Sequence, residues 1–465
     1  MVITSIAYFM IPFDGSAVNV ALPYIAHSLH ASLSTLIWIP TVYLLVFATL
    51  ETTMGRLGDI RGKRNLFIIT LVIFTIGSLF AGLSASIGQL ILARILQGLG
   101  GAGMDAIGLS IIAGAFPEGR RGRAFGLNSM VVYIGLTSGP ALGGLLVQYL
   151  GWRSLFYVNI PIGIAAVILS ILFIQKDATE VKSRQQFDVL GAVTLAGFLI
   201  TVLLILNGHD FALPEIGNIL LYTTCTLFII GFIYVEMKVS QAPLLDLHLF
   251  TRNRLFAGGS ATSLMNYLTV FGTLFVLSVY LQSILGFSPL EAGLILLPQP
   301  IFMAISAPIA GALSDRISAQ VLSSIGMGLK TIAFLFLATL GTSSSIASIA
   351  IPLVVVGIGH GFFSSPNLNS VMGSVTAEKF GIASGTMGTI RQSGQSIGIA
   401  VLGGIVASHL PIGSLNIFAS AIVLKGVLAL DFVSGVRIAF LTAAVICGIG
   451  IFTSLMRGKQ KGTGT

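Results

Sequence analysis

Residues 34–84 read STLIWIPTVYLLVFATLETTM (34–54), GRLGDIRGKR (55–64) and, after Asn65, LFIITLVIFTIGSLFAGLS (66–84). The two outer stretches are almost free of charge, and each has the length of about 20 residues that an α-helix needs to cross about 30 Å of hydrocarbon. The short stretch between them carries glycines and basic residues, which suit a tight turn at a membrane surface. We therefore predict two helices that cross a membrane in opposite directions.

The composition of the whole chain follows the same pattern. Of its 465 residues, 55% are hydrophobic and only 9% are charged, whereas a soluble domain carries about 25% charged residues. A globule of this size still needs a polar surface, so the composition excludes a soluble protein. Cys225 and Cys447 lie in apolar runs without the spacing of a disulfide framework or a metal site, and we expect no cofactor or metal.

Fourteen apolar runs predict an all-α polytopic membrane protein with fourteen transmembrane helices. The run at the N-terminus lacks a basic leading region, so we interpret it as a retained helix and not as a signal peptide. The semi-apolar stretch 411–435 contains Lys425 and Asp431 and is interpreted as an extracellular loop or a surface helix. The predicted spans are 3–27, 34–54, 66–84, 88–115, 124–149, 155–174, 188–207, 216–237, 255–284, 291–312, 319–341, 346–373, 382–409 and 436–456.

Basic residues indicate the orientation of these spans. Eighteen Lys and Arg residues lie on one side of the predicted helices and three on the other. Because cytoplasmic loops carry the excess of Lys and Arg, both termini are predicted to be cytoplasmic, in a plasma membrane. The net charge of +8 is then a sign of topology, and nucleic acid is not expected as a partner.

Two pairs of landmarks recur at nearly the same offset, which indicates a duplicated chain. Asp59 and Asp315 are 256 residues apart, and Gly122 and Gly381 are 259 apart. Both halves have the same orientation, and parallel repeats of this kind build transporters with a site at the repeat interface. The predicted domains are a six-helix bundle (1–175), a two-helix insertion with cytoplasmic linkers (176–253) and a second six-helix bundle (254–465).

Five motifs, in order along nearly the whole chain, resemble those of the fourteen-helix drug:proton antiporters of the major facilitator superfamily. The resemblance implies the major facilitator fold, in which two six-helix bundles rock around a central cavity lined by spans 1, 4, 9 and 12. It also implies proton transfer through Arg94. The motifs are Asp14–Pro23, Gly55–Arg64, Leu92–Gly100, Gly135–Gly144, and Trp152-Arg153 with Asn159–Gly163.

Carboxylates inside predicted spans are the first candidates for function. An ionisable group in the bilayer core is costly and suggests a functional role. Burial favours the neutral form of a carboxyl group, so such a group can exchange a proton and, when ionised, hold a cation. A structural bond to a neighbouring helix is the alternative, and Arg94 could equally be a strut held by carbonyl groups. The predicted proton-coupling residues are Asp14, Asp105, Arg94 and Glu51.

Polar and aromatic side chains in the spans are candidates for a substrate cavity. Arg94 and Asp105 face nearly the same direction on one helix, about 16 Å apart, and Gln97 lies one turn from Arg94. Aromatic rings can bind flat apolar molecules or cations, although packing is their commoner role. Lys330 and Arg391 also lie inside spans, and we assign them no role. The predicted cavity residues are Asn19, Gln97, Tyr267, Phe271, His360 and Phe363.

Two further motifs have a mechanical interpretation. A charge network at the first turn and its degenerate repeat would hold the cytoplasmic side shut. Glycines four residues apart would let the fifth span pack closely and bend against a neighbour. The gating-loop candidates are Gly55, Arg56, Gly58, Asp59, Arg61, Gly62, Arg64, Asp315 and Arg316, and the antiporter-motif candidates are Gly135, Gly139, Pro140, Gly143 and Gly144.

The sequence thus favours a proton-coupled antiporter that exports small lipophilic, cationic compounds by alternating access. A proton-coupled symporter, or an exporter of a specific metabolite or lipid, is the alternative. The only literal enzyme motif, Gly394–Gly398, lies inside an apolar helical run, whereas a nucleophile elbow needs a strand, a turn and a helix. We therefore expect no enzyme. The expected partners are the substrate, protons and membrane lipid, with the protein as a monomer.

Overall fold

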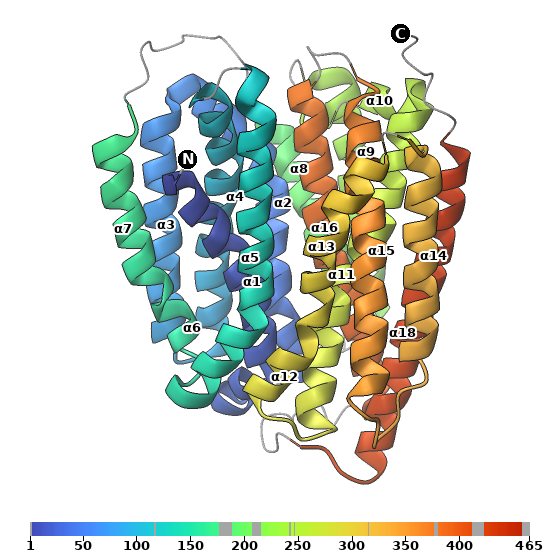
Figure 1. The fold of residues 1–465 in the computed structure, drawn as a ribbon. Coiled ribbons are helices and arrows are strands. Elements are labelled where there is room, and N and C mark those ends of the chain that lie inside the picture. Colours follow the sequence, from blue (N-terminus) through green and yellow to red (C-terminus); the bar gives the residue numbers. More distant parts are fainter. Residues whose placement is uncertain are drawn as a thin grey trace.

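The computed structural model describes residues 2–115, 118–175, 188–206, 215–240, 243–245, 247–314, 316–375, 380–411 and 423–457. Within these ranges nearly every residue is helical and no strand occurs. The long helices run side by side (Figure 1). This confirms the prediction of an all-helical membrane protein.

The first group of helices packs around α1 and α4. α1 lies along α5, and α4 lies between α2 and α3. α7 packs on α3. The bounds are α1 (Val2–Leu29), α2 (Leu33–Arg61), α3 (Lys63–Leu83), α4 (Ile87–Ala115), α5 (Glu118–Leu150), α6 (Ser154–Tyr157) and α7 (Asn159–Phe173).

The last group of helices packs around α11 and α15. α15 lies between α13 and α14, and α11 lies along α16 and α18. The bounds are α10 (Leu247–Arg252), α11 (Arg254–Ser283), α12 (Pro289–Leu296), α13 (Pro298–Leu313), α14 (Ala319–Leu337), α15 (Ala347–Met372), α16 (Phe380–Ser408) and α18 (Val427–Met456).

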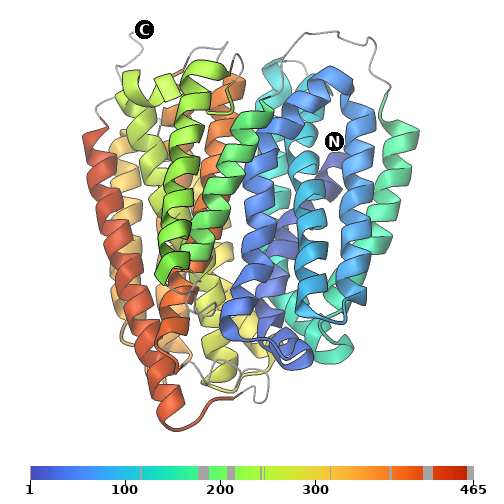
Figure 2. The same ribbon diagram turned by 180° about the vertical axis from the view of Figure 1, so that it is seen from behind.

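Two helices between these groups lie over the seam that separates them. They are α8 (Val189–Leu206) and α9 (Glu215–Tyr234), which continues as the π-helix η2 (Val235–Val239). α8 packs on α2 of the first group and α16 of the last, and α9 packs on α8. Figure 2 shows this pair in green, in front of the blue and the orange helices.

The predicted spans fall on these helices. Thirteen segments among the described residues are long and apolar enough to cross a membrane. α16 is not one of them, but it is 29 residues long and packs between α2 and α11. Two predicted spans are each divided into two consecutive helices: one at Val158, between α6 and α7, and one at Leu297, where Pro298 begins α13. Proline favours this first helical position because its missing N–H is not needed there.

The turn predicted at 55–64 is wrong for most of its length. α2 continues through Arg61, and only Gly62, with φ of 93°, turns the chain into α3. Gly55 and Gly58 serve close packing against α4, since a methyl group at Gly58 would lie 3.2 Å from Ile107 Cγ1. Leu, Arg and Met favour the helical conformation, so α2 continues past the two glycines.

The interpretation of 411–435 as a loop or surface helix is also wrong in part. α18 begins at Val427, after Gly426 with φ of 64°, whereas the predicted span began at 436. Phe432 and Val433 are buried in the bundle, so packing extends the helix beyond the most apolar stretch. Residues 412–422 lie outside the described part of the chain.

The two groups meet tightly at one end of the molecule. We name the basic end the one at which α2 ends and α11 begins, drawn at the top of Figure 1 with the C-terminus. At the opposite end, Ser278 Oγ of α11 donates to the Asn19 carbonyl of α1 at 2.7 Å, and Gln282 Nε2 donates to the Val20 carbonyl at 3.0 Å. Residues 13–23 and 269–284 are buried on every side, whereas the basic-end parts of both helices are partly exposed. The space between the groups is thus closed at the end opposite the basic end.

Candidate functional site

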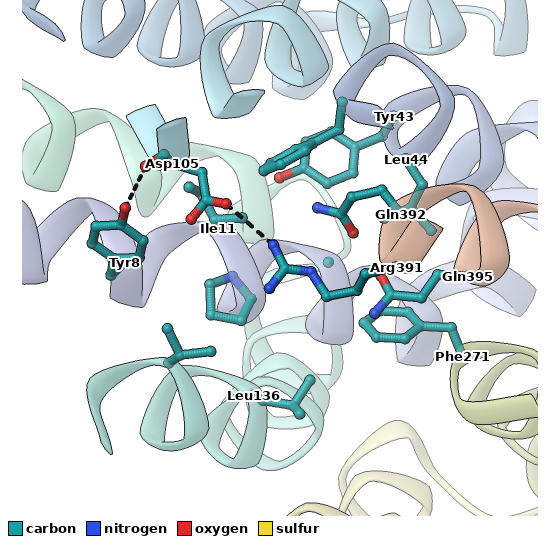
Figure 3. Close-up of a pocket in the computed structure, with 14 residues that line it drawn as sticks. Tyr8, Ile11, Tyr43, Leu44, Asp105, Leu136, Phe271, Arg391, Gln392 and Gln395 are labelled. Carbon is teal, nitrogen blue, oxygen red and sulfur yellow. Dashed lines mark hydrogen bonds and ion pairs between the residues drawn. The ribbon is translucent and has the colours of Figure 1, made fainter. Parts of the chain in front are cut away.

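A pocket lies between the two groups of helices, halfway along them. Its space is about 650 Å³, including its open mouth. Apolar and aromatic side chains form most of its wall, and a few polar groups converge in it (Figure 3). The lining residues are Tyr8, Ile11, Pro12, Gly15, Tyr43, Leu44, Phe47, Asp105, Val132, Leu136, Phe271, Arg391, Gln392 and Gln395.

Three charged side chains meet at this pocket and join the two groups. Arg391 Nη2 of α16 lies 3.2 Å from Asp105 Oδ2 of α4 and 3.6 Å from Glu51 Oε1 of α2. The Arg391 side chain is 39% exposed, whereas those of Asp105 and Glu51 are 11% and 9% exposed. With all three ionised the cluster carries one negative charge. A single proton or a single cationic group would therefore neutralise it.

The neighbours of this acidic cluster hold it in place. The Tyr8 hydroxyl of α1 donates to the backbone carbonyl of Asp105, as Figure 3 shows. Gly388 of α16 lies against the Glu51 carboxylate, and a methyl group there would lie 2.5 Å from Oε1. Glycine at this position therefore lets α16 approach α2.

A second charged cluster is enclosed in the first group of helices. Asp14 of α1 forms an ion pair with Arg94 of α4, and their side chains are 1% and 0% exposed. Arg94 Nη1 also donates to Gln97 Oε1 at 2.9 Å, and Asn159 Nδ2 donates to Asp14 Oδ1 at 3.0 Å. This cluster has no net charge when ionised. The predicted residues Asp14, Arg94 and Gln97 are thus brought together.

Tyr43 separates the enclosed cluster from the pocket. Its ring lines the pocket, and the Arg94 guanidinium lies 4.3 Å from the ring centroid. Neither Asp14 nor Arg94 lines the pocket. The four residues predicted for proton coupling therefore occupy two sites. Asp105 lines the pocket and Glu51 lies beside Arg391 in the acidic cluster, whereas Asp14 and Arg94 lie behind the pocket wall.

The predicted cavity residues are spread over several places. Phe271 lines the pocket, and Gln97 belongs to the enclosed cluster. The rings of Tyr267 and His360 are in edge contact at 5.7 Å, and Phe363 is 1% exposed in the packed core. Asn19 takes part in the closure at the end opposite the basic end.

The glycine motif on α5 packs against two neighbours. A methyl group at Gly135 would lie 2.6 Å from the Phe9 carbonyl, and one at Gly143 would lie 2.8 Å from Ala17 Cβ. Gly139 likewise meets Ser16 of α1, whereas Gly144 meets Pro289 of α12. Pro140 lies inside α5, and its carbonyl contacts Gly293 of α12.

The gating candidates have individual roles in the described structure. Arg64 donates to the carbonyls of Ile171 and Ile174, each at 2.7 Å, and so caps the end of α7. Arg56 Nη2 donates to the Pro243 carbonyl at 2.6 Å, while Arg61 and Arg316 are exposed. Asp315 and the Asp59 side chain lie outside the described part of the structure.

Sequence reasoning assigned no role to Arg391, Gln392 or Gln395, which lie in the pocket wall. The signal was present, because Arg391 is a basic residue inside an apolar span, where charge suggests function. What the sequence lacked was its partner, since Asp105 is 286 residues away.

Comparison with known proteins agrees with this geometry. A family model described as Major Facilitator Superfamily matches residues 4–399. The riboflavin transporter RibZ of Clostridioides difficile is 35% identical over 412 residues, which cover 88% of each chain. The multidrug resistance protein Stp of Mycobacterium tuberculosis is 34% identical over 414 residues, which cover 88% of this chain and 76% of that one.

Solved structures share the fold. A bacterial homologue of the human lysosomal transporter Spinster, in an inward-facing and occupied conformation, superposes with a TM-score of 0.65 at 17% identity. The match covers 98% of this chain and 95% of that one.

Proposed function

Since this chain belongs to the major facilitator superfamily, a family of membrane transporters, we propose that it is a proton-coupled antiporter that exports small lipophilic compounds, with cations preferred. The observation that supports this most strongly is the acidic cluster, in which Asp105 and Arg391 line the pocket and Glu51 lies beside Arg391. One site that holds either a proton or a cation is the simplest device for exchange.

Competition within the acidic cluster would couple the two ions. While both carboxylates are ionised, Arg391 neutralises only one of them, and the low dielectric of the interior strengthens the remaining attraction for a cation. A proton on Asp105 or Glu51 removes that attraction and releases a bound cation. An exchange of one proton for one monovalent cation moves no net charge, so the pH gradient drives it. With a neutral substrate, the membrane potential would add about 2.3 kcal/mol per elementary charge per 100 mV.

Alternating access would require the contacts between α1 and α11 to break. We place the basic end in the cytoplasm, following the distribution of Lys and Arg, with both termini on that side of the plasma membrane. The bundles 1–175 and 254–465 would then rock about the pocket, with the insertion 176–253 over their seam. The described conformation corresponds to the one closed to the outside. The protein would act as a monomer in lipid.

Export or uptake of a specific metabolite is the second candidate. The relative named as a riboflavin transporter supports it, and its identity to this chain, 35%, is close to the 34% of the relative named for multidrug resistance. Gln392 and Gln395 in the pocket could bind the carbonyl and amide groups of a neutral substrate.

Transport by purified protein in vesicles tests the proposal. Ethidium and riboflavin are added separately, and proton movement is followed with a pH-sensitive dye. Ethidium should drive proton release through the wild type, and Asp105→Asn and Glu51→Gln should each lower that release at least tenfold. The matched control is Asp431→Asn on α18, outside the pocket.

The outcomes separate the candidates. If riboflavin moves and ethidium does not, the metabolite carrier replaces the drug antiporter. If ethidium moves without protons, antiport is wrong. If both pocket variants behave like Asp431→Asn, the acidic cluster does not couple transport.

A further inference from the structure

Among the described residues of the second half, the buried Lys330 forms no ion pair with a carboxylate. Lys330 of α14 is 0% exposed. Its Nζ atom donates to the Asn266 carbonyl at 3.0 Å, to Asn266 Oδ1 at 2.7 Å and to Thr269 Oγ1 at 2.7 Å. In the part of the chain that the structure describes, no ion pair joins Lys330 to an acid. An uncompensated charge inside a membrane protein is costly.

In the first half, a carboxylate neutralises the buried cation. There the buried cation Arg94 is held by a residue of α1, the carboxylate of Asp14. In the second half the corresponding first helix, α11, offers the amide of Asn266 instead. A guanidinium keeps its proton in proteins, so the Arg94 cluster is neutral with fixed charges. The Lys330 cluster is neutral only when the amine has lost its proton, a change that lysine can undergo.

The surroundings of Lys330 fit both states of the amine. An ammonium group has three N–H donors, and three acceptors lie within 3.0 Å. A neutral amine has two donors and a lone pair. The Thr269 hydroxyl, which donates to the Asn266 carbonyl at 2.8 Å, can turn to donate to that lone pair. Neither state leaves Nζ without partners.

Asn266 connects Lys330 to His360. Its Oδ1 atom accepts from Lys330, so its Nδ2 atom faces His360 Nδ1, at 3.2 Å. Nδ1 therefore accepts, and the neutral ring carries its proton on Nε2. A proton on Nδ1 would face another N–H until the amide turned over, and the turn would take Oδ1 away from Lys330. The pair is thus built to hold one extra proton, not two.

Among the described residues, two further titratable side chains, Cys447 and Tyr267, contact this site. Cys447 of α18 lies 3.8 Å from Thr269 Oγ1, and Tyr267 of α11 contacts the His360 ring. Phe334 lies 5.9 Å from Lys330 Nζ. None of these side chains supplies a fixed negative charge. Lys330 therefore carries the single proton, and Asn266 and His360 are its neutral partners.

We propose that Lys330, Asn266 and His360 form a proton-binding site in the second half, separate from the acidic cluster, that holds one proton and releases it during transport. The role in transport rests on the proposed proton coupling, whereas proton binding itself does not. A cycle that used both sites would move more than one proton.

Proton counting on purified protein in detergent tests the site without transport. The protein is titrated over the physiological pH range, and the wild type is compared with Lys330→Arg, which keeps the charge but cannot release it. The wild type should release one proton more per molecule. Lys330→Met combined with His360→Gln, which leaves no titratable group at the site, should show the same deficit and serves if arginine does not fit. Thr331→Val on the same helix, whose hydroxyl donates to the Met327 carbonyl of α14, should match the wild type.

Equal proton counts in the wild type and both Lys330 variants would overturn the site, whatever the transport result. Transport is measured separately in vesicles. There Lys330→Arg should lose proton-driven ethidium movement at least tenfold but keep ethidium exchange between the two sides, which needs no net proton flow. Proton-driven movement at the wild-type rate in Lys330→Arg would overturn the role in transport. If the wild type moves ethidium without moving protons, the proposed antiport is wrong. The proton count in detergent would then still test whether Lys330, Asn266 and His360 bind a proton.

Discussion

Arg94 and Arg391 both bind carboxylates, and their settings differ. Arg94 is 0% exposed and shares a neutral, enclosed cluster with Asp14, whereas Arg391 is 39% exposed in the pocket and bridges Asp105 and Glu51. Removing one member of an enclosed pair leaves a bare charge in the interior, which is strongly destabilising. A partly exposed arginine can exchange its partner for water or substrate.

Asp14→Asn should therefore lower stability. The uncompensated Arg94 charge should reduce the free energy of unfolding by about 3–5 kcal/mol, measured in detergent by denaturant titration. The double variant Asp14→Asn with Arg94→Leu should lose less than the two single variants added together. Wild-type stability combined with lost transport in Asp14→Asn would instead show that Asp14 acts in coupling, as the sequence suggested.

Arg391→Gln should strengthen the binding of cations. Without its guanidinium, the pocket holds two ionised carboxylates and no basic partner, so ethidium should bind roughly tenfold more tightly above neutral pH, or about 1.4 kcal/mol. Ethidium fluorescence measures the Kd directly. Arg316→Gln, on the exposed surface, is the control, and an unchanged or weaker affinity in Arg391→Gln would contradict the arrangement.

At the scale of helices, glycines allow α5 and α12 to come into contact near the closed end of the molecule. The carbonyls of Pro140 in α5 and Pro289 in α12 lie against Gly293 and Gly144, respectively, so the two backbones touch. A side chain at either glycine would push the helices apart. The contact lies toward the end that is closed in this conformation.

Gly293→Ala should thus open the closed end. A cysteine introduced as Phe271→Cys in the pocket should then react several-fold faster with a membrane-impermeant maleimide added from outside, in a background with Cys225→Ser and Cys447→Ser. Gly448→Ala, where a methyl group would meet no atom within 4 Å, should leave the rate unchanged. Equal rates in both variants would show that this contact does not set the closed state.

At the scale of the whole molecule, the two ends differ in charge, and the pair α8 and α9 lies on one side of the seam between the two groups of helices (Figure 2). α8 bridges α2 and α16, the two helices that also carry Glu51 and Arg391. α8 therefore packs on both helices that join the two groups at the acidic cluster. The pocket lies midway between the basic end and the closed end, as alternating access requires.

The orientation leads to a prediction about labelling in intact cells. Ser345→Cys, exposed at the end opposite the basic end, should react with an impermeant maleimide from outside. Arg316→Cys, exposed at the basic end, should react only after the membrane is permeabilised. The same cysteine-free background serves both variants, and the reverse pattern would place the basic end outside.

The sequence by itself determined the helices, their order and the family. These depend on local properties: the length of apolar runs, the spacing of glycines and motifs, and the position of basic residues. It also identified Asp14, Asp105, Arg94 and Glu51 as unusual, because charge inside an apolar span is visible without a structure.

Only the tertiary structure decided which of these residues share a site. Asp14 and Asp105 both lie in spans, yet Tyr43 places one behind the wall and leaves the other in the pocket with Arg391. The role proposed for Lys330 depends on Asn266 and His360, which only the tertiary structure places beside it. The physical reason is that neighbours across a bundle depend on the rotation and crossing of helices, which side chains from distant segments fix together and no single segment encodes.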